Sequence, residues 1–215
     1  MKIKTILSLA LLGMVTAVNS APYNAIGAGS STIGTTGSED YASLNAAVVA
    51  VNAALTRDAS TWTFLIATDL TEPNNSFLGV TVDPAGAIVF KPAPTTAPVI
   101  TFTRTNDNAA TSGNLIIGTS LDSNALSADT PTRNITIDGS NAANGTTRDL
   151  TITNSSTIVH SFSSLIAIFG DSDFITVKNT NIINANSGIV SNVSGLSVRP
   201  RYETPNFGIP DNTVI

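Results

Sequence analysis

The sequence predicts an all-β protein, a parallel β-solenoid with three short strands per turn, preceded by one α-helix. From Trp62 onward the chain consists of short segments rich in Val, Ile, Thr and Phe, bounded by Gly, Pro, Asn and Asp, which is the pattern of β-strands. Only 12% of the 215 residues are charged, whereas threonine (30) and asparagine (21) are abundant. Two similar segments, which begin at Asn134 and Phe174, recur 40 residues apart, as expected of a repeat fold.

The first twenty residues form a separate segment. Lys2 and Lys4 precede an apolar run from Ile6 to Val18, and small residues follow it. This order is typical of a Sec-type signal peptide, here with cleavage after Ser20. The run is too short to cross the about 30 Å of a bilayer's hydrocarbon as a helix. We therefore expect an exported protein, secreted or at the cell surface, whose mature chain has no transmembrane segment.

Composition excludes two further classes of protein. The chain has no cysteine, so it has neither a disulfide framework nor a cysteine-ligated zinc site. Its formal net charge is -5, and it has no basic patch of the kind that nucleic-acid binding requires. We therefore expect no nucleic-acid partner.

One helix is predicted, over Ser38–Leu55, after an irregular lead-in at residues 22–38 that is rich in Gly, Ser and Thr. Ser38 can cap the first N–H groups, and the acidic residues at positions 39 and 40 suit the first turn of a helix. Apolar residues then recur at spacings of three and four and form one stripe: Tyr41, Leu44, Val48, Val51 and Leu55.

The strands are predicted in ten segments, namely Thr63–Ala67, Gly79–Val82, Ala87–Lys91, Val99–Thr103, Asn114–Gly118, Asn134–Asp138, Leu150–Asn154, Leu165–Phe169, Phe174–Asn179 and Gly188–Val190. In a stacked solenoid the inward positions bury apolar residues, and threonine suits the outward pleated surface. Asparagine and glycine suit sharp corners, and Gly139, Asn154 and Asn179 are the predicted corner residues. Because an open first turn exposes a strand edge, we expect the helix to cover it.

The order of a helix containing Tyr41–Val48, a strand near Trp62, and the segments Val80–Val82 and Ile88–Pro92 resembles the start of right-handed parallel β-helix proteins of the pectin-lyase-like superfamily. The segments Asn134–Asn141 and Thr147–Asn154 are more closely similar to large secreted or surface proteins of Bacteroidota-type bacteria. The resemblance covers roughly residues 39–190.

The resemblance implies a right-handed β-helix with an N-terminal capping α-helix, as the first module of a longer chain. On this interpretation residues 1–20 are the signal peptide, and residues 21–61 are the lead-in and cap helix. Residues 62–215 are then β-helix, truncated at the C-terminus.

Three aspartates are candidates for a calcium site: Asp138, Asp171 and Asp173. Asp171 and Asp173 point the same way in an extended stretch, and calcium prefers carboxylate oxygens. Arg133 and Arg148 lie near Asp138 and Asp149 in the sequence, where an arginine could serve as a catalytic base or bind an anion. The alternative interpretation is that Asp and Asn occupy solenoid corners and bond the local backbone, in which case the chain needs no cofactor.

Other polar and aromatic residues have simpler explanations than catalysis or ligand binding. His160 is the only histidine, and no nucleophile pattern accompanies it. Trp62 and Tyr41 could stack on a sugar ring, but both fall in the region of the helix and first strand, where packing is the favoured interpretation.

Two functions remain open from the sequence. The first is a non-enzymatic structural, adhesion or glycan-contacting scaffold that binds a polysaccharide or cell-surface glycan through many weak contacts. The second is part of a polysaccharide lyase or hydrolase. None of the superfamily's catalytic motifs matches this chain residue by residue, so no catalytic residue is assigned.

Overall fold

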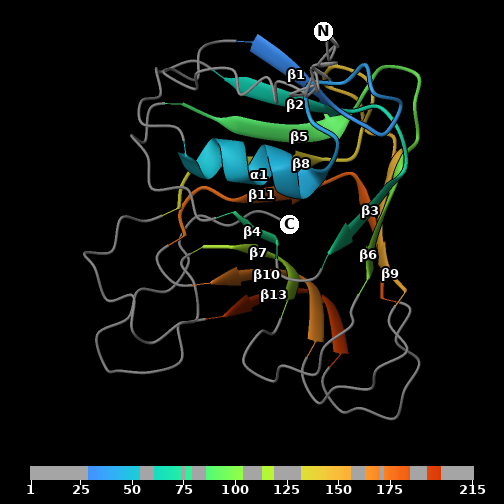
Figure 1. Ribbon diagram of the computed structural model, residues 1–215. Helices are drawn as coiled ribbons and strands as arrows, with labels where there is room; N and C mark the ends of the chain where they lie inside the picture. Colours follow the sequence, from blue (N-terminus) through green and yellow to red (C-terminus); the bar gives the residue numbers. More distant parts are fainter. Residues whose placement is uncertain are drawn as a thin grey trace, which may run out of the picture.

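The computed structural model describes residues 29–53, 61–73, 76–78, 86–103, 113–118, 132–155, 163–169, 172–184 and 193–199. These residues form strands in parallel sheets and one short helix, α1 (Leu44–Ala53) (Figure 1). The predicted all-β content with one N-terminal helix is therefore confirmed. Within the described part of the chain, no helix has both the length and the apolar character that crossing a membrane requires.

The strands form three sheets. The first sheet has the order β1 (Gly29–Ile33), β2 (Trp62–Ile66), β5 (Ile88–Pro92), β8 (Ile135–Asp138) and β11 (Thr176–Lys178). The second has the order β3 (Leu70–Pro73), β6 (Val99–Thr103), β9 (Leu150–Asn154) and β12 (Thr180–Ile183). The third has the order β4 (Ser76–Leu78), β7 (Gly113–Ile117), β10 (Ser163–Phe169) and β13 (Val193–Arg199).

From β2 onward the chain enters the first, second and third sheets in turn, and each strand pairs with the strand three places later. We call each set of three consecutive strands, one from each sheet, a rung. Thr136 of β8 aligns with Thr176 of β11, and Arg133 forms a bridge with Asp173. Both pairs are separated by 40 residues, so the predicted 40-residue repeat is confirmed in this part of the chain.

Inward side chains of successive rungs stack in columns. One column joins Phe64, Phe90, Ile137 and Val177, each at most 4% exposed. The rings of Phe64 and Phe90 are stacked, with centroids 4.9 Å apart and planes 15° from parallel. Because paired strands lie about 4.8 Å apart, the ring spacing matches the strand spacing. The hydrophobic core therefore runs through the space between the sheets, from rung to rung.

Asparagine and glycine form the tight corner between the first and second sheets. Asn179 alone connects β11 to β12, and its φ of 53° lies in the left-handed region that asparagine tolerates. Gly139 follows β8 one rung earlier, where a Cβ atom would lie 1.7 Å from the carbonyl oxygen of Asn179. These two predicted corners are confirmed. Asn154, predicted as a third corner, is instead the buried last residue of β9 and donates Nδ2 to Asn184 Oδ1 at 2.9 Å.

The segment before the helix differs from its prediction as an irregular lead-in, because residues 29–33 form β1 at the edge of the first sheet. The sequence of β1 lacks an alternating apolar pattern, so it does not predict a strand that pairs with β2. Its outer edge is covered: Thr32 donates its backbone N–H to Asp40 Oδ2 at 2.7 Å, and the Thr32 carbonyl accepts from Tyr41 N at 3.0 Å. These bonds protect an edge that could otherwise pair with another chain.

The helix begins at Leu44, and the prediction that it begins at Ser38 is wrong. The Glu39 carboxylate accepts hydrogen bonds from the backbone N–H groups of residues 36–38, so it folds this segment back instead of entering a helical turn. Ser43 is the actual cap, since its Oγ accepts from Ala46 N at 3.0 Å. The predicted end at Leu55 lies outside the described residues.

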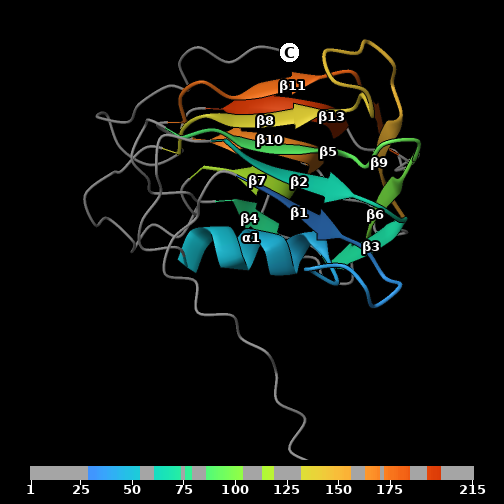
Figure 2. The ribbon, with the colours of Figure 1, turned by 90° about the horizontal axis from the view of Figure 1, so that it is seen from above.

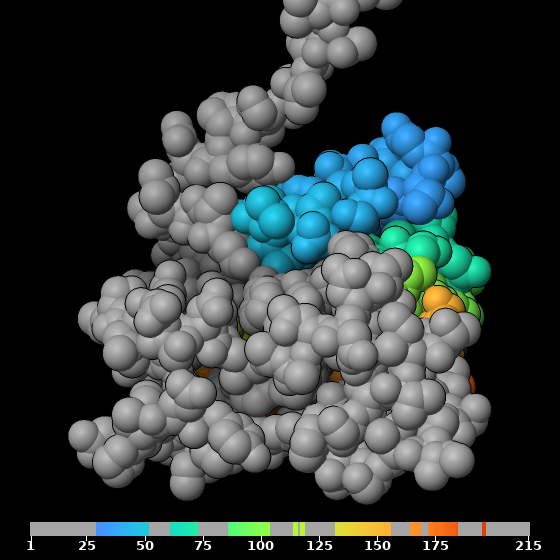
Figure 3. All heavy atoms as spheres, turned by 60° about the horizontal axis from the view of Figure 1, so that its bottom comes forward, coloured from blue at the N-terminus to red at the C-terminus, as the bar shows by residue number. Residues whose placement is uncertain are grey.

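A buried carboxylate joins α1 to the second sheet. Glu72 of β3 is fully buried, and its two oxygens accept from Leu44 N at 2.5 Å and Asn45 N at 3.1 Å. Burial raises the pKa of Glu72 and outweighs the two backbone hydrogen bonds, which lower it. The helix contacts β3 and β4 at the end of the stack that also carries β1 (Figure 2). Its outer surface is visible in Figure 3, and Val49 is 57% exposed.

Eight predicted strands agree with the structure within two residues at each end. Phe174–Asn179 is shortened to Thr176–Lys178, because Phe174 and Asn179 have φ values of 55° and 53° that end the extended backbone. Predicted strands Gly79–Val82 and Gly188–Val190 lie outside the described residues. The strands β3, β4, β12 and β13 were not predicted; β3 contains Glu and Pro, which are rare in strands.

We expect Gly139→Ala to lower the free energy of unfolding by about 3 kcal/mol or more, because overpacking against backbone cannot be relieved by a rotamer change. Chemical denaturation of the purified protein measures this change. Gly29→Ala is the matched control, since a Cβ there meets nothing within 4 Å, and its effect should stay within about 0.5 kcal/mol. Equal stability of the two variants would contradict the close approach at the corner.

We expect the contribution of Glu72 to the free energy of unfolding to increase as the pH falls. Its folded pKa is raised above 4.5, so the folded state binds the proton more tightly than the unfolded state between these two pKa values. This stabilising contribution is fully present below pH 4.5 and is lost as the pH rises through the pKa of Glu72 in the folded protein. The unfolding free energy of the wild type minus that of Glu72→Gln, measured across this range, isolates Glu72 from other acids. A difference that is flat or increases with pH would refute the assignment.

Candidate functional site

The corner between the first and second sheets carries an added loop in one rung. Lys178 aligns with Asp138, and Thr180 aligns with Leu150, so residues 140–149 have no counterpart in the rung of β11 and β12. We call residues 140–149 the corner loop. The Gly139 carbonyl closes its base by accepting from Asp149 N at 2.8 Å and from Leu150 N at 3.0 Å. The chain therefore returns to the stack at the point where it left.

On the side of β5 and β6, two side chains hold the first part of the corner loop. Lys91 donates Nζ to the Ala142 carbonyl at 3.1 Å. Asn141 donates Nδ2 to the Thr96 carbonyl at 3.0 Å. These bonds fix the loop to the preceding rung.

On the side of β11 and β12, two asparagines hold the second part of the corner loop. Asn179 donates Nδ2 to the Gly145 carbonyl at 3.2 Å, and Asn181 donates Nδ2 to the Arg148 carbonyl at 3.1 Å. With bonds to the rungs on both sides, the loop is an integral part of the stack.

Inside the corner loop, polar side chains bond one another. Ser140 and Thr147 share a hydrogen bond of 2.9 Å between their hydroxyls, and Thr147 donates to Asp149 Oδ2 at 2.6 Å. The same oxygen accepts from Asn141 N at 3.0 Å. These bonds, the one from Asn141 N first, lower the pKa of Asp149. The carboxylate thus acts as the structural acceptor of a turn, in agreement with the corner interpretation of the acidic residues.

Asp138 is a buried carboxylate at the start of this corner. It accepts from Asn179 Nδ2 at 2.9 Å and Ser140 N at 3.1 Å, and Lys178 Nζ lies 3.3 Å from Oδ2. Burial raises the pKa of Asp138, but the hydrogen bonds and the Lys178 charge together outweigh burial, so the pKa is lowered. Its acceptor capacity is therefore used within the corner.

Asp173 lies on the adjacent rung, as the 40-residue repeat predicts, but at the other end of the strand. It forms an ion pair with Arg133, with Nε and Oδ2 2.8 Å apart. Because Lys178 aligns with Asp138, the three extended residues of β11 separate Asp173 from the level of Asp138, which is about 10 Å along the strand direction. One calcium ion binds its oxygens at about 2.3–2.6 Å, so Asp138 and Asp173 are too far apart to share it.

The other candidate residues are placed as follows. Asp171 and His160 lie outside the described residues. Among the described residues, no three acidic, histidine or cysteine side chains gather where they could hold a metal ion. Trp62 and Tyr41 are each 8% exposed, and Trp62 donates Nε1 to Ser31 Oγ at 3.1 Å. The prediction that both aromatic residues pack is confirmed, which removes them as exposed sugar-stacking platforms.

Threonines line the outward face of the second sheet in register. Thr71, Thr101 and Thr153 align across β3, β6 and β9, and each alternates with buried neighbours. We call these three, with the flanking Thr103 and Thr151, the threonine face. The sequence predicted outward threonines in general, but the columns depend on strand register, which only the structure supplies. The strands that carry this face lie along one side of the molecule in Figure 1.

The hydroxyls of the threonine face fall into two groups. Thr153 donates to the Ile183 carbonyl at 2.8 Å, and Thr103 donates to the Glu72 carbonyl at 3.2 Å. The hydroxyls of Thr71, Thr101 and Thr151 make no hydrogen bond with another described residue. The face therefore combines two hydroxyls that brace neighbouring rungs with three that can bond a partner.

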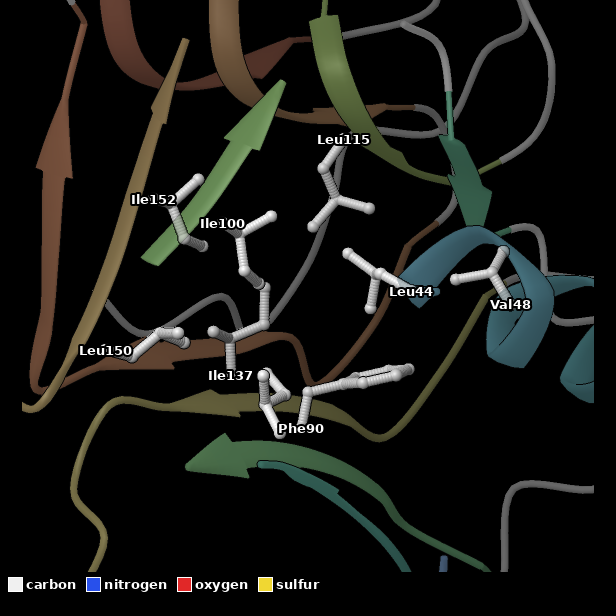
Figure 4. Close-up of a pocket in the computed structure, with 9 residues that line it drawn as sticks. Leu44, Val48, Phe90, Ile100, Leu115, Ile137, Leu150 and Ile152 are labelled. Atoms are coloured by element: carbon white, nitrogen blue, oxygen red, sulfur yellow. The ribbon is translucent and has the colours of Figure 1, made fainter. Parts of the chain in front are cut away.

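An interior gap of about 10 Å³ lies between the sheets and α1 (Figure 4). A water molecule needs about this volume together with several polar partners, and the lining side chains are all apolar. The gap is therefore a small packing defect of the core. Its lining consists of Leu44, Val48, Ile66, Phe90, Ile100, Leu115, Ile137, Leu150 and Ile152.

No family model, curated protein or solved structure matches the chain. The resemblance to pectin-lyase-like proteins consequently stays a prediction from the sequence. The described acids hold local hydrogen bonds and ion pairs, and they do not supply a converged catalytic set to the lyase or hydrolase alternative.

We expect Asp138→Asn to lower the free energy of unfolding at neutral pH by about 1–3 kcal/mol, the usual range for a buried charged acceptor. The folded pKa lies below 3.8, so this contribution is present above pH 3.8 and is lost as the pH falls through the folded pKa. Denaturant unfolding of both proteins at neutral pH and in strong acid measures the difference.

Lys178→Met is the control for this effect, because it removes the cation but leaves the hydrogen bonds from Asn179 and Ser140. Its cost should be smaller than that of Asp138→Asn, since Lys178 is half-exposed and screened by solvent. If the wild type remained more stable than Asp138→Asn by the same free energy of unfolding in strong acid, the ionised Asp138 carboxylate would not be the source of the difference.

Proposed function

We propose that this chain is an exported β-helix module that serves as a structural or adhesion scaffold and contacts a polysaccharide or cell-surface glycan. The observation that carries the proposal is the threonine face. It presents hydroxyl and methyl groups in register on one outward sheet surface.

The fold within this proposal is a right-handed parallel β-helix with three strands per turn, capped at its N-terminal end by α1. The strand order, in which each strand pairs with the one three places later, supports it. The contacts of α1 with β3 and β4, and the hydrogen bonds from its first N–H groups to Glu72, support the capping role.

The geometry of the threonine face suits a repetitive polymer. Thr71, Thr101 and Thr153 recur at the strand spacing of about 4.8 Å, which is comparable to the rise of one sugar in an extended glycan. The hydroxyls of Thr71, Thr101 and Thr151 are available to donate and accept hydrogen bonds. Threonine methyl groups can contact the C–H surfaces of sugar rings.

Binding on such a face would be multivalent. A single hydroxyl contributes about 1 kcal/mol through a net hydrogen bond, so affinity for one sugar would be low. Several contacts along one polymer chain raise the effective affinity without any deep pocket. This mechanism needs a rigid, regularly spaced surface, which the stacked rungs supply.

The proposed location is outside the cell or on its surface, by way of a Sec-type signal peptide in residues 1–20. Lys2 and Lys4 before an apolar run, with small residues after it, support this location. The low content of charged residues, 12% of the chain, and the absence of cysteine are compatible with an exported chain that is stabilised by burial and backbone hydrogen bonds.

A glycan array followed by retention on the polysaccharides that bind tests the function. We expect the double variant Thr71→Val and Thr101→Val to weaken retention roughly tenfold or more, because two hydrogen bonds of about 1 kcal/mol each are lost while shape is kept. Neither hydroxyl bonds another described residue, so folding should be unchanged.

The matched control is the double variant Thr63→Val and Thr176→Val, which removes two outward hydroxyls from the first sheet. Those two positions share a column that already contains Val89. This control should retain binding. Equal loss in both double variants, or no polysaccharide bound by the wild type, would overturn the proposal.

A further inference from the structure

We propose that Asn144, at the tip of the corner loop, is a site of spontaneous deamidation in the folded protein, where it converts to aspartate and isoaspartate. This modification is independent of the proposed glycan contact.

The first basis is the residue that follows. Asn144 precedes Gly145, and this is the only Asn-Gly pair in the chain. Deamidation requires the next backbone nitrogen to reach the asparagine side chain, and a glycine without Cβ hinders that approach least. Every other asparagine in the chain precedes a residue with a side chain.

The second basis is the freedom of the Asn144 side chain. Asn144 is exposed, and its amide makes no hydrogen bond with any other described residue. By contrast, the amides of Asn141, Asn179 and Asn181 donate to backbone carbonyls at 3.0–3.2 Å. Asn154 is buried and bonded to Asn184. Asn144 is thus free to rotate towards its neighbour, whereas these asparagines are held.

The third basis is the weak closure of the turn. Gly145 N donates to the Ala142 carbonyl at 3.3 Å, near the long limit for an N–H···O bond. Asn144 has a φ of 54°, and rotation about its Cα–C and Cα–Cβ bonds brings the Gly145 nitrogen to the side-chain carbon. Apart from this long bond, the turn is held from outside by Asn179 Nδ2 on the Gly145 carbonyl and by Lys91 Nζ on the Ala142 carbonyl, and neither of these bonds engages the Gly145 nitrogen or the Asn144 side chain. Local opening at the tip is therefore sufficient, and the rungs can remain stacked.

The reaction needs only water. The Gly145 nitrogen attacks Asn144 Cγ, a C–N bond forms, and the Cγ–Nδ2 bond breaks. The nitrogen's proton goes to the leaving group, which departs as ammonia and leaves a five-membered succinimide. Water then adds at Cγ to give aspartate, or at the backbone carbonyl carbon to give isoaspartate, and in each case opens the ring at the bond to nitrogen. The net change replaces one amide by one carboxylic acid.

The test is incubation of the folded mature protein at mildly alkaline pH, followed by peptide mapping with mass spectrometry and labelling with an isoaspartyl methyltransferase. We expect the amide-to-acid mass change to appear in the peptide containing residues 141–148 before any other peptide. The methyl label should appear in the same peptide.

Asn144→Gln is the control variant, because its longer side chain would have to close a six-membered ring, and both signals should disappear from this peptide. A substitution of Gly145 is less suitable, since a Cβ there would lie 2.2 Å from Ser140 Oγ. The proposal is overturned if other asparagines convert first. It is also overturned if Asn144 converts in the denatured protein while staying intact in the folded protein, because the turn would then protect it.

Discussion

The register between rungs is the constraint on which the rest of this structure depends. Each inward side chain must pack on its counterpart about 4.8 Å away, and the stacked rings of Phe64 and Phe90 show how closely this spacing is met. An insertion is compatible with such a stack only if the chain leaves and re-enters at one point. The corner loop satisfies this condition, because the single carbonyl of Gly139 accepts from both Asp149 N and Leu150 N.

Two buried carboxylates, Glu72 and Asp138, show that the position of a carboxylate within the stack determines the direction of its pKa shift. Glu72 faces the N-terminus of α1 with two backbone N–H donors, and burial dominates, so its pKa is raised. Asp138 sits at a corner, where two hydrogen-bond donors and the Lys178 ammonium outweigh burial, so its pKa is lowered. The opposite shifts follow from what each carboxylate can reach: the interior offers Glu72 backbone dipoles, whereas the corner offers Asp138 a cation as well. Acid conditions therefore favour the contact of Glu72 with α1 and weaken the corner at Asp138.

The sequence predicted the repeating features well, because they depend on local patterns. Alternating Val, Ile and Phe with Thr located most strands, and the recurrence of Asn134–Asp138 at Phe174 gave the correct repeat. Features that depend on partners distant in sequence were missed. Nothing in Gly29–Ile33 shows that it pairs with β2, and Glu39 resembles a first-turn helix residue until its bonds to residues 36–38 are seen. For the site, the sequence offered both a calcium site and corner structure for the aspartates, and the corner role holds for Asp138. The threonine face required the register of three strands separated by about 30 to 50 residues.

The corner loop and the threonine face are physically connected, because the loop leads from the first sheet into the second. Asn181, which holds the Arg148 carbonyl, aligns with Thr151 of the threonine face. The base of the loop is therefore bonded to the stack, whereas the turn at its tip is closed by one long backbone hydrogen bond and by the bond from Asn179 to the Gly145 carbonyl. A change at the tip can reach the threonine face only by disturbing the bonds of Asn179 and Asn181 to the loop carbonyls. Asn179 bonds the Gly145 carbonyl next to the tip, whereas Asn181 bonds the Arg148 carbonyl near the base. A chemical change at Asn144 therefore meets the Asn179 bond first, and the Asn181 bond at the base stands between that change and the threonine columns.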